Sequence, residues 1–189
     1  MSSWGATDAD ESKPKFLTDA EKKLVFANTS GWVLEAGSAF SGNDNTSATP
    51  EVLVAIGDLT TSLGNADITD VELPTSYSKG TGGNFDVTVR FNEAVDVTGN
   101  PTILITNNTS SSRNQTATYV SGTGTNELIF RKANAAATLN ASDVLKVVAA
   151  SPYIALSGGT VKDEGTNTAS SLNIAASIAT ASGTLTVAA

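Results

Sequence analysis

The side chains that most enzymes and zinc sites use are missing from this chain. Its 189 residues include no cysteine and no histidine. This absence excludes the Ser-His-Asp and Cys-His arrangements of nucleophilic catalysis, and the thiolate and imidazole ligands of structural zinc. A pair of carboxylates, as in glycoside hydrolases, is the remaining route to catalysis. Because the sequence marks no acidic pair as lying in a cleft, we expect a protein without enzymatic activity and without a cofactor.

The loop around Gly165 has the side chains that a hard cation needs. Asp163, Glu164 and Asn167 lie close together there, and carboxylate and amide oxygens are the usual ligands of Ca²⁺. Their spacing differs from that of an EF-hand loop, and the run Asp-Glu-Gly-Thr-Asn is also typical of an ordinary turn. We therefore expect a turn, and keep these three residues only as weak candidates for metal ligands.

The charge of the chain restricts its partners. The formal net charge is −8 at pH 7, and a protein this acidic gains nothing from neutralising phosphates, so we expect no nucleic-acid partner. Anionic membranes are disfavoured for the same reason, and no apolar run approaches the roughly 20 residues of a membrane-spanning helix. Asp67, Asp70 and Glu72 are expected on a solvated strand edge, where carboxylates discourage edge-to-edge pairing.

Bulky apolar side chains mark the first third of the chain. Residues 1–65 have few signals of regular structure, which predicts a mostly extended N-terminal arm. Its aromatic residues could dock into a partner as interface anchors, each contributing roughly 2–3 kcal/mol when well buried. They could instead fold back and form a small core of their own, and the sequence leaves both arrangements open. The candidate anchors are Trp4, Phe16, Leu17, Phe26 and Trp32.

One short helix is predicted within the arm. The run Thr18-Asp-Ala-Glu21 fits a capping box, in which the Thr18 hydroxyl accepts from the Glu21 amide and the Glu21 carboxylate accepts from the Thr18 amide. The helix should run over about 19–27, which is too short to be stable alone in water, so it must pack on something. Short extended pieces are expected at 30–37 and 51–56.

From about residue 66 onward the sequence favours β-structure. Residues 84–91 alternate strictly between apolar and polar side chains, the period of a strand with one buried face. Short strands with turn signals between them indicate an antiparallel sandwich or barrel, and we expect no helix here. Strands are expected at 67–73, 84–91, 102–106, 116–120, 126–131 and from Val144, with less regular ones at 153–156, 157–162, 171–178 and 183–187.

Several of these segments together resemble a known repeat. The runs 77–101, Ala117–Phe130 and Ile154–Asp163 are similar, in order and spacing, to the immunoglobulin-like β-sandwich repeats of large bacterial surface proteins. The resemblance covers about residues 66–175, and that family uses the domain as a spacer or adhesive module without catalytic residues. It implies an all-β fold, in which residues 66–189 form an immunoglobulin-like antiparallel β-sandwich behind the arm of residues 1–65.

The N-terminal segment has a resemblance of its own. Residues 3–17 and 43–57 are similar to the openings of small structural proteins from tailed phages of marine cyanobacteria. This implies a non-enzymatic virion protein, most directly a capsid decoration (cement) protein whose arm binds the major capsid protein on the outside of the head, with self-association as a further option. The first residues lack a basic start and an apolar stretch, so we expect synthesis in the host cytoplasm without a signal peptide.

An adhesion or carbohydrate-binding immunoglobulin-like module, including an accessory protein of a tail or neck, is the alternative. Its specificity would lie in end loops such as Asn107–Gln115. Sugar-binding surfaces generally present an exposed Trp or Tyr, and this loop contains neither. The composition of the loop therefore favours the virion protein.

Overall fold

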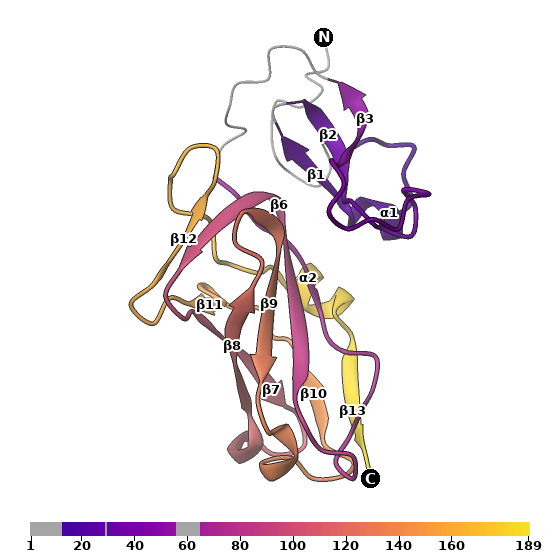
Figure 1. Ribbon diagram of the computed structural model, residues 1–189. Helices are drawn as coiled ribbons and strands as arrows, with labels where there is room; N and C mark the ends of the chain where they lie inside the picture. Colours follow the sequence, from indigo (N-terminus) through magenta and orange to yellow (C-terminus); the bar gives the residue numbers. More distant parts are fainter. Residues whose placement is uncertain (1–12, 29, 56–64) are drawn as a thin grey trace.

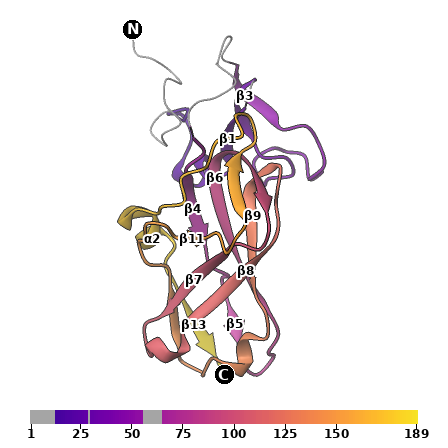
Figure 2. The ribbon, with the colours of Figure 1, turned by 90° about the vertical axis from the view of Figure 1, so that its left-hand side faces the viewer.

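The computed structural model describes residues 13–28, 30–55 and 65–189. A small β-lobe, residues 13–55, lies at one end of an elongated main domain, residues 65–189, and the C-terminus lies at the opposite end (Figures 1 and 2). Strands dominate both parts, which confirms the all-β class. No helix in the described part of the chain is long and apolar enough to cross a membrane.

The lobe opens with the predicted capping box. The Glu21 amide donates to the Thr18 hydroxyl (3.3 Å), and the Thr18 amide donates to the Glu21 carboxylate (2.7 Å). Helix α1 spans only Asp19–Lys22, whereas the sequence predicted a helix to about Ala27. The chain leaves the helix early because the next residues are β-branched and aromatic, and they bury more surface as a paired strand than in an isolated helix.

Three short strands complete the lobe. Strand β1 (Val25–Asn28) pairs antiparallel with β2 (Gly31–Leu34), and β2 pairs antiparallel with β3 (Glu51–Ala55). The last two strands occupy the extended pieces that the sequence predicted. The described part of the arm, expected to be mostly extended, therefore folds into a three-stranded sheet with a loop over 35–50, because its apolar side chains cover one another when β2 turns back along β1.

The lobe has a hydrophobic core of its own. Trp32 is 1% exposed and packs with Val25, Ala27 and Leu34, while Leu17 contacts this core from the edge. Phe26 points to the other face of the same sheet, toward the main domain, and is 8% exposed. Both faces of β1 and β2 are thus covered, one by the lobe and the other by its neighbour.

The main domain is built around the 14-residue strand β6 (Phe85–Thr98). On one side β6 pairs with β4 (Ile68–Glu72) and β12 (Thr160–Asp163), and on the other with β9 (Thr125–Lys132). The path of paired strands then continues around a single core. Its further elements are β8 (Gln115–Ser121), β7 (Thr102–Asn107), β11 (Ile154–Ala155), β10 (Val144–Lys146), β13 (Thr184–Ala188) and β5 (Tyr77–Ser78), with the short helices η2 (Ser111–Arg113), η3 (Ala135–Ala137) and α2 (Ala176–Ala181).

The sheet is mixed, whereas the sequence predicted antiparallel pairing throughout. Strand β1 lies parallel to β6 through Ala27 and Glu93, and β13 lies parallel to β5. Turn patterns in a sequence predict only hairpins, which join strands that follow one another along the chain. Both parallel pairs join segments far apart in the chain, which leaves no local mark in the sequence.

The alternating residues of β6 face the core as predicted. Phe85, Val87, Val89 and Phe91 are each at most 4% exposed. Two other segments differ from the prediction. Strand β6 runs on to Thr98, well beyond the predicted 84–91, and the strand expected over 171–178 gives way to α2, where a run rich in alanine favours helix.

A bulge in β4 places its residues on unexpected faces. Ile68 and Val71 are both buried in the core although they lie three residues apart. A shift of register between Ile68 and Asp70 makes this possible, since a bulge adds one residue to one strand of a pair. The same shift turns Asp70 away from the core and toward the lobe.

Because the lobe and the main domain have separate cores, damage to one core should leave the other folded. Trp32→Ala removes the largest side chain of the lobe core and should destabilise the lobe by about 3–5 kcal/mol. Hydrogen exchange should then become fast within residues 13–55 and stay slow in β6 and β9. The matched control is Phe130→Ala in the other core, which should speed exchange in the main domain. Equal loss of protection in both parts after Trp32→Ala would contradict two separate cores.

Candidate functional site

The predicted anchor residues lie in different environments. Phe16 is 68% exposed, and Leu17 is partly buried against the lobe core. Trp32 lies inside that core and Phe26 at the junction with the main domain, which is the folded-back arrangement for both. Trp32 is therefore not available to a partner while the lobe is folded, and Phe26 keeps only 8% of its surface exposed. Trp4 lies outside the described residues.

A network of charged side chains joins the lobe to the main domain. The guanidinium of Arg90, in β6, lies 2.7 Å from the Glu72 carboxylate and 2.9 Å from that of Glu127. It also lies 3.6 Å from Asp70, whose other oxygen is 3.1 Å from the ammonium of Lys23 in the lobe. Removing one partner would leave a poorly solvated charge uncompensated, so the network fixes how the two parts meet.

Asp70 lies inside this network and not on a solvated strand edge. Only 3% of it is exposed, because the lobe covers the face to which the bulge of β4 turns it. Asp67 is exposed, and the Glu72 side chain is 55% exposed, as expected for both. The sequence pattern of the strand shows an acidic outer face, but it contains no sign of the element that covers part of that face.

Two carboxyl groups meet across the junction. Glu35 follows β2 in the lobe, and its amide donates to the Leu24 carbonyl (2.8 Å), while Glu127 lies in β9. Burial raises the pKa of Glu35 to about 7, and the charge of Glu127 and a hydrogen bond between the two carboxyl groups act in the same direction, against the effect of Arg90. Glu35 therefore keeps its proton at mildly acidic pH.

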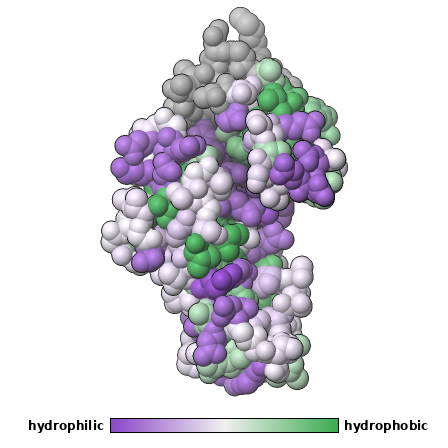
Figure 3. Space-filling view, in the orientation of Figure 1, coloured by the Kyte–Doolittle hydropathy of each residue, from purple (hydrophilic) through white to green (hydrophobic). Residues whose placement is uncertain are grey.

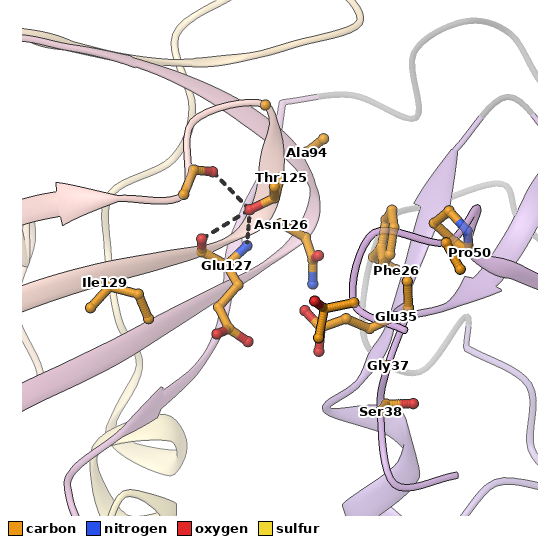
Figure 4. A pocket seen from close by; sticks show the side chains of 15 residues that line it. Phe26, Glu35, Gly37, Ser38, Pro50, Ala94, Thr125, Asn126, Glu127 and Ile129 are labelled. Carbon is orange, nitrogen blue, oxygen red and sulfur yellow. Dashed lines mark hydrogen bonds between the residues drawn. The ribbon is translucent and has the colours of Figure 1, made fainter. Parts of the chain in front are cut away.

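A cavity of about 570 Å³ opens beside this pair (Figure 4). Phe26, Glu35 and Pro50 line it from the lobe, and Asn126 and Glu127 from the main domain. Asn126 is 2% exposed, and its amide nitrogen has no hydrogen-bond partner among the described residues. A buried donor without a partner costs roughly 1–3 kcal/mol, and a ligand that accepts a hydrogen bond from this amide would remove that cost.

The carboxyl pair bears on the question of catalysis. The sequence marked no acidic pair in a cleft, and the structure brings Glu35 and Glu127 together from distant segments that share no motif. Glycosidases also use two carboxyl groups, one of them with a raised pKa, held about 5 Å apart or more to admit the sugar. Glu35 and Glu127 line one cavity from two parts of the molecule, an arrangement that we interpret as suited to the binding of a ligand.

The candidate cation loop is a hydrogen-bonded turn. Asp163 is 1% exposed, and one carboxylate oxygen accepts from the Thr166 amide (2.7 Å) and hydroxyl (2.9 Å). Burial raises the pKa of Asp163, but a side-chain contact with Glu93 and the hydrogen bonds donated by Thr166 outweigh it and lower the pKa. The side-chain oxygen of Asn167 accepts from the Lys162 ammonium, and Glu164 is exposed. Within the described ranges no group of three acidic side chains could hold a metal ion.

The loop Asn107–Gln115, the recognition loop of the alternative function, is fixed by an ion pair. Arg113 donates through Nε and Nη2 to both oxygens of Asp143, at 2.8 and 2.6 Å. Asp143 is 1% exposed and also accepts from the Asn140 amide. These contacts hold the pKa of the Asp143 carboxyl well below its usual range, and the hydrogen bonds from Arg113 have the largest effect.

The raised pKa of Glu35 should make the protein less stable as the pH rises. Glu35 is protonated up to about pH 7 in the folded chain but only up to about 4.5 in the unfolded chain. The folded state thus binds more protons between these values, and the free energy of unfolding falls across that window. Glu35→Gln, which mimics the protonated group, should match the wild type near pH 5 and exceed its stability at pH 8 by on the order of 2 kcal/mol.

Urea denaturation at both pH values measures this difference. Glu51→Gln, on the exposed side of β3, is the matched control and should keep the pH dependence of the wild type. If Glu35→Gln shows the same stability relative to the wild type at pH 5 and pH 8, the carboxyl pair does not hold a proton.

The burial of Asp143 should make its ion pair count for more than an exposed one. Arg113→Ala leaves Asp143 buried without its partner, whereas Arg131→Ala breaks a bidentate pair with Asp86 in which both side chains are well exposed (44% and 39%). The melting temperature should therefore fall by several degrees more for Arg113→Ala. An equal decrease in melting temperature for both variants would show that the burial of Asp143 does not strengthen its ion pair.

The chain has no significant match among protein-family models, curated proteins or solved structures. The all-β class and the mixed sheet therefore come from the coordinates alone. The likeness to immunoglobulin-like repeats and to phage structural proteins stays a prediction from sequence motifs.

Proposed function

We propose that the protein is a non-enzymatic structural protein of a virion, a decoration protein that binds the outer surface of a phage head through its N-terminal lobe. Its partner is the major capsid protein of the same virion, and its main domain is an immunoglobulin-like sandwich. The similarity of residues 3–17 and 43–57 to phage structural proteins supports the location. The similarity of residues 66–175 to immunoglobulin-like spacer domains supports the role.

The observation that carries this proposal is the apolar edge of the lobe. Strand β3 is the last in the order of paired strands, so its outer edge has no partner strand among the described residues. Val52 is 46% exposed, while Leu53 and Val54 pack against the lobe core and are only partly exposed. Figure 3 shows apolar side chains gathered over this part of the lobe. Proteins usually blunt an exposed edge strand with charges or proline. Pro50 and Glu51 stand at the start of β3, but residues 52–55 carry neither, so a partner's strand can add to the sheet there.

The arrangement of the two parts supports attachment by one end. The edge strand lies in the lobe together with two exposed aromatic side chains, Phe16 (68%) and Phe40 (49%). The main domain extends from the lobe to the C-terminus (Figure 1), so a chain held by its lobe projects the main domain away from the surface. A lobe that is already folded loses less conformational entropy on binding than an extended arm does.

A charge on the edge strand should prevent attachment without unfolding the lobe. Val52→Glu, at an exposed position, should remove the chain from shells assembled by co-expression with the major capsid protein of the same genome, as measured by sedimentation. The matched control is Leu104→Glu, at an equally exposed apolar position (49%) of the main domain, and it should sediment with the shells. Failure of the wild-type chain to sediment would contradict the capsid role, and equal binding of both variants would contradict attachment through β3.

A further inference from the structure

The charged network at the junction is short of positive charge. Two cationic groups face four carboxyl groups, a balance of −2 when all are ionised and −1 when Glu35 keeps its proton. Burial contributes most to keeping a proton on Glu35 near neutral pH, and the repulsion from Glu127, opposed by Arg90, adds to it. The groups are Lys23, Arg90, Glu35, Asp70, Glu72 and Glu127.

The cavity beside the pair offers a place for a larger cation. Glu35 enters it from the lobe and Glu127 from the main domain, while Asn126 points across the gap between them (Figure 4). Much of the remaining lining is apolar and includes Phe26 and Ile129. A ligand in this position would meet carboxyl groups at one point and hydrocarbon elsewhere.

The lining distinguishes an organic cation from a metal ion. A volume of about 570 Å³ is within the range of small-molecule sites and far exceeds the space that one ion fills. The cavity offers only two carboxyl groups. Among the described residues, no group of three or more acidic side chains could hold a metal ion. The unpartnered Asn126 amide nitrogen is a donor, which a metal ion cannot use but which the carbonyl oxygen of an organic ligand can accept.

We propose that this cavity binds a primary ammonium group carried on an aliphatic chain, as in a lysine side chain or a free alkylamine. The ammonium lies between Glu35 and Glu127 and displaces the proton of the Glu35 carboxyl group, which passes to solvent. The aliphatic chain lies along Phe26 and Ile129. A carbonyl oxygen of a lysine-bearing peptide accepts from the Asn126 amide, a contact that a simple alkylamine lacks.

Titration calorimetry with three small probes tests the chemistry. Nα-acetyl-lysine-N-methylamide should bind, and the norleucine analogue, which has the same chain without the ammonium, should bind at least about tenfold more weakly. Pentylamine should bind as well. A weaker affinity for pentylamine than for the lysine derivative points to a peptide lysine as the source, and an equal or stronger affinity points to a free amine. Equal binding of the lysine and norleucine derivatives, or no binding of either amine, would overturn the proposal.

The exchange of a proton for the ammonium gives a second readout. In buffers with different ionisation enthalpies, binding at pH 7 should release roughly half a proton per ligand, because Glu35 is about half protonated there. Affinity should rise between pH 6 and pH 8. Binding without proton release, at an affinity independent of pH, would place the ligand elsewhere.

Substitutions separate this site from the rest of the protein. Glu35→Gln should abolish proton release and weaken binding of the lysine derivative at least about tenfold, while Glu51→Gln should bind as the wild type does. Because Glu35→Gln is expected to be at least as stable as the wild type, a loss of binding is not a loss of folding. Val52→Glu should also bind normally, so this proposal and attachment through β3 fail or hold independently. Unchanged binding by Glu35→Gln would overturn it.

Discussion

The guanidinium of Arg90 is the contact on which the arrangement of the two parts depends. It is 9% exposed and touches carboxylates from both neighbours of β6, namely Glu72 on the strand-β4 side and Glu127 in β9. Through Asp70 it is linked to Lys23 of the lobe, and it also acts on the charge of Glu35. A flat group with five donors can serve several acceptors at once, which a lysine in the same position could not do. The lobe therefore packs on a preformed polar surface, and its side chains complete that surface.

Strand β6 allows the lobe to pack on this polar surface because its two faces carry different kinds of side chain. One face carries the large apolar residues that fill the core, and the other presents Arg90 to the lobe. The single parallel contact between Ala27 and Glu93 is too small to hold the lobe alone. Apolar contact through Phe26 and the charged network supply the remainder. A core of its own gives the lobe shape, but its position comes from these junction contacts.

The sequence predicted most of the framework and little of the junction. The strict alternation of residues 84–91 and the capping box at Thr18 are local patterns, and the structure confirms both. The early end of α1 and the helix α2 were missed because short apolar or alanine-rich runs fit either state until tertiary contacts decide. Glu35, Glu127 and Asn126 could not be found from sequence, since their importance arises only where two distant segments meet. Asp70 was misjudged for the same reason, because an acidic strand edge and a covered one have the same sequence pattern.

The division of the cavity walls between two parts has a mechanical consequence. A ligand that touches both Glu35 and Glu127 is a cross-link, and pulling the lobe from the main domain must break the ligand's contacts as well as the protein's own. Occupancy thus raises the force at which the lobe detaches, and detachment in turn releases the ligand, because coupling between two binding equilibria is reciprocal. In a chain that is held by its lobe, a pulling force would therefore change the affinity of the cavity for its ligand.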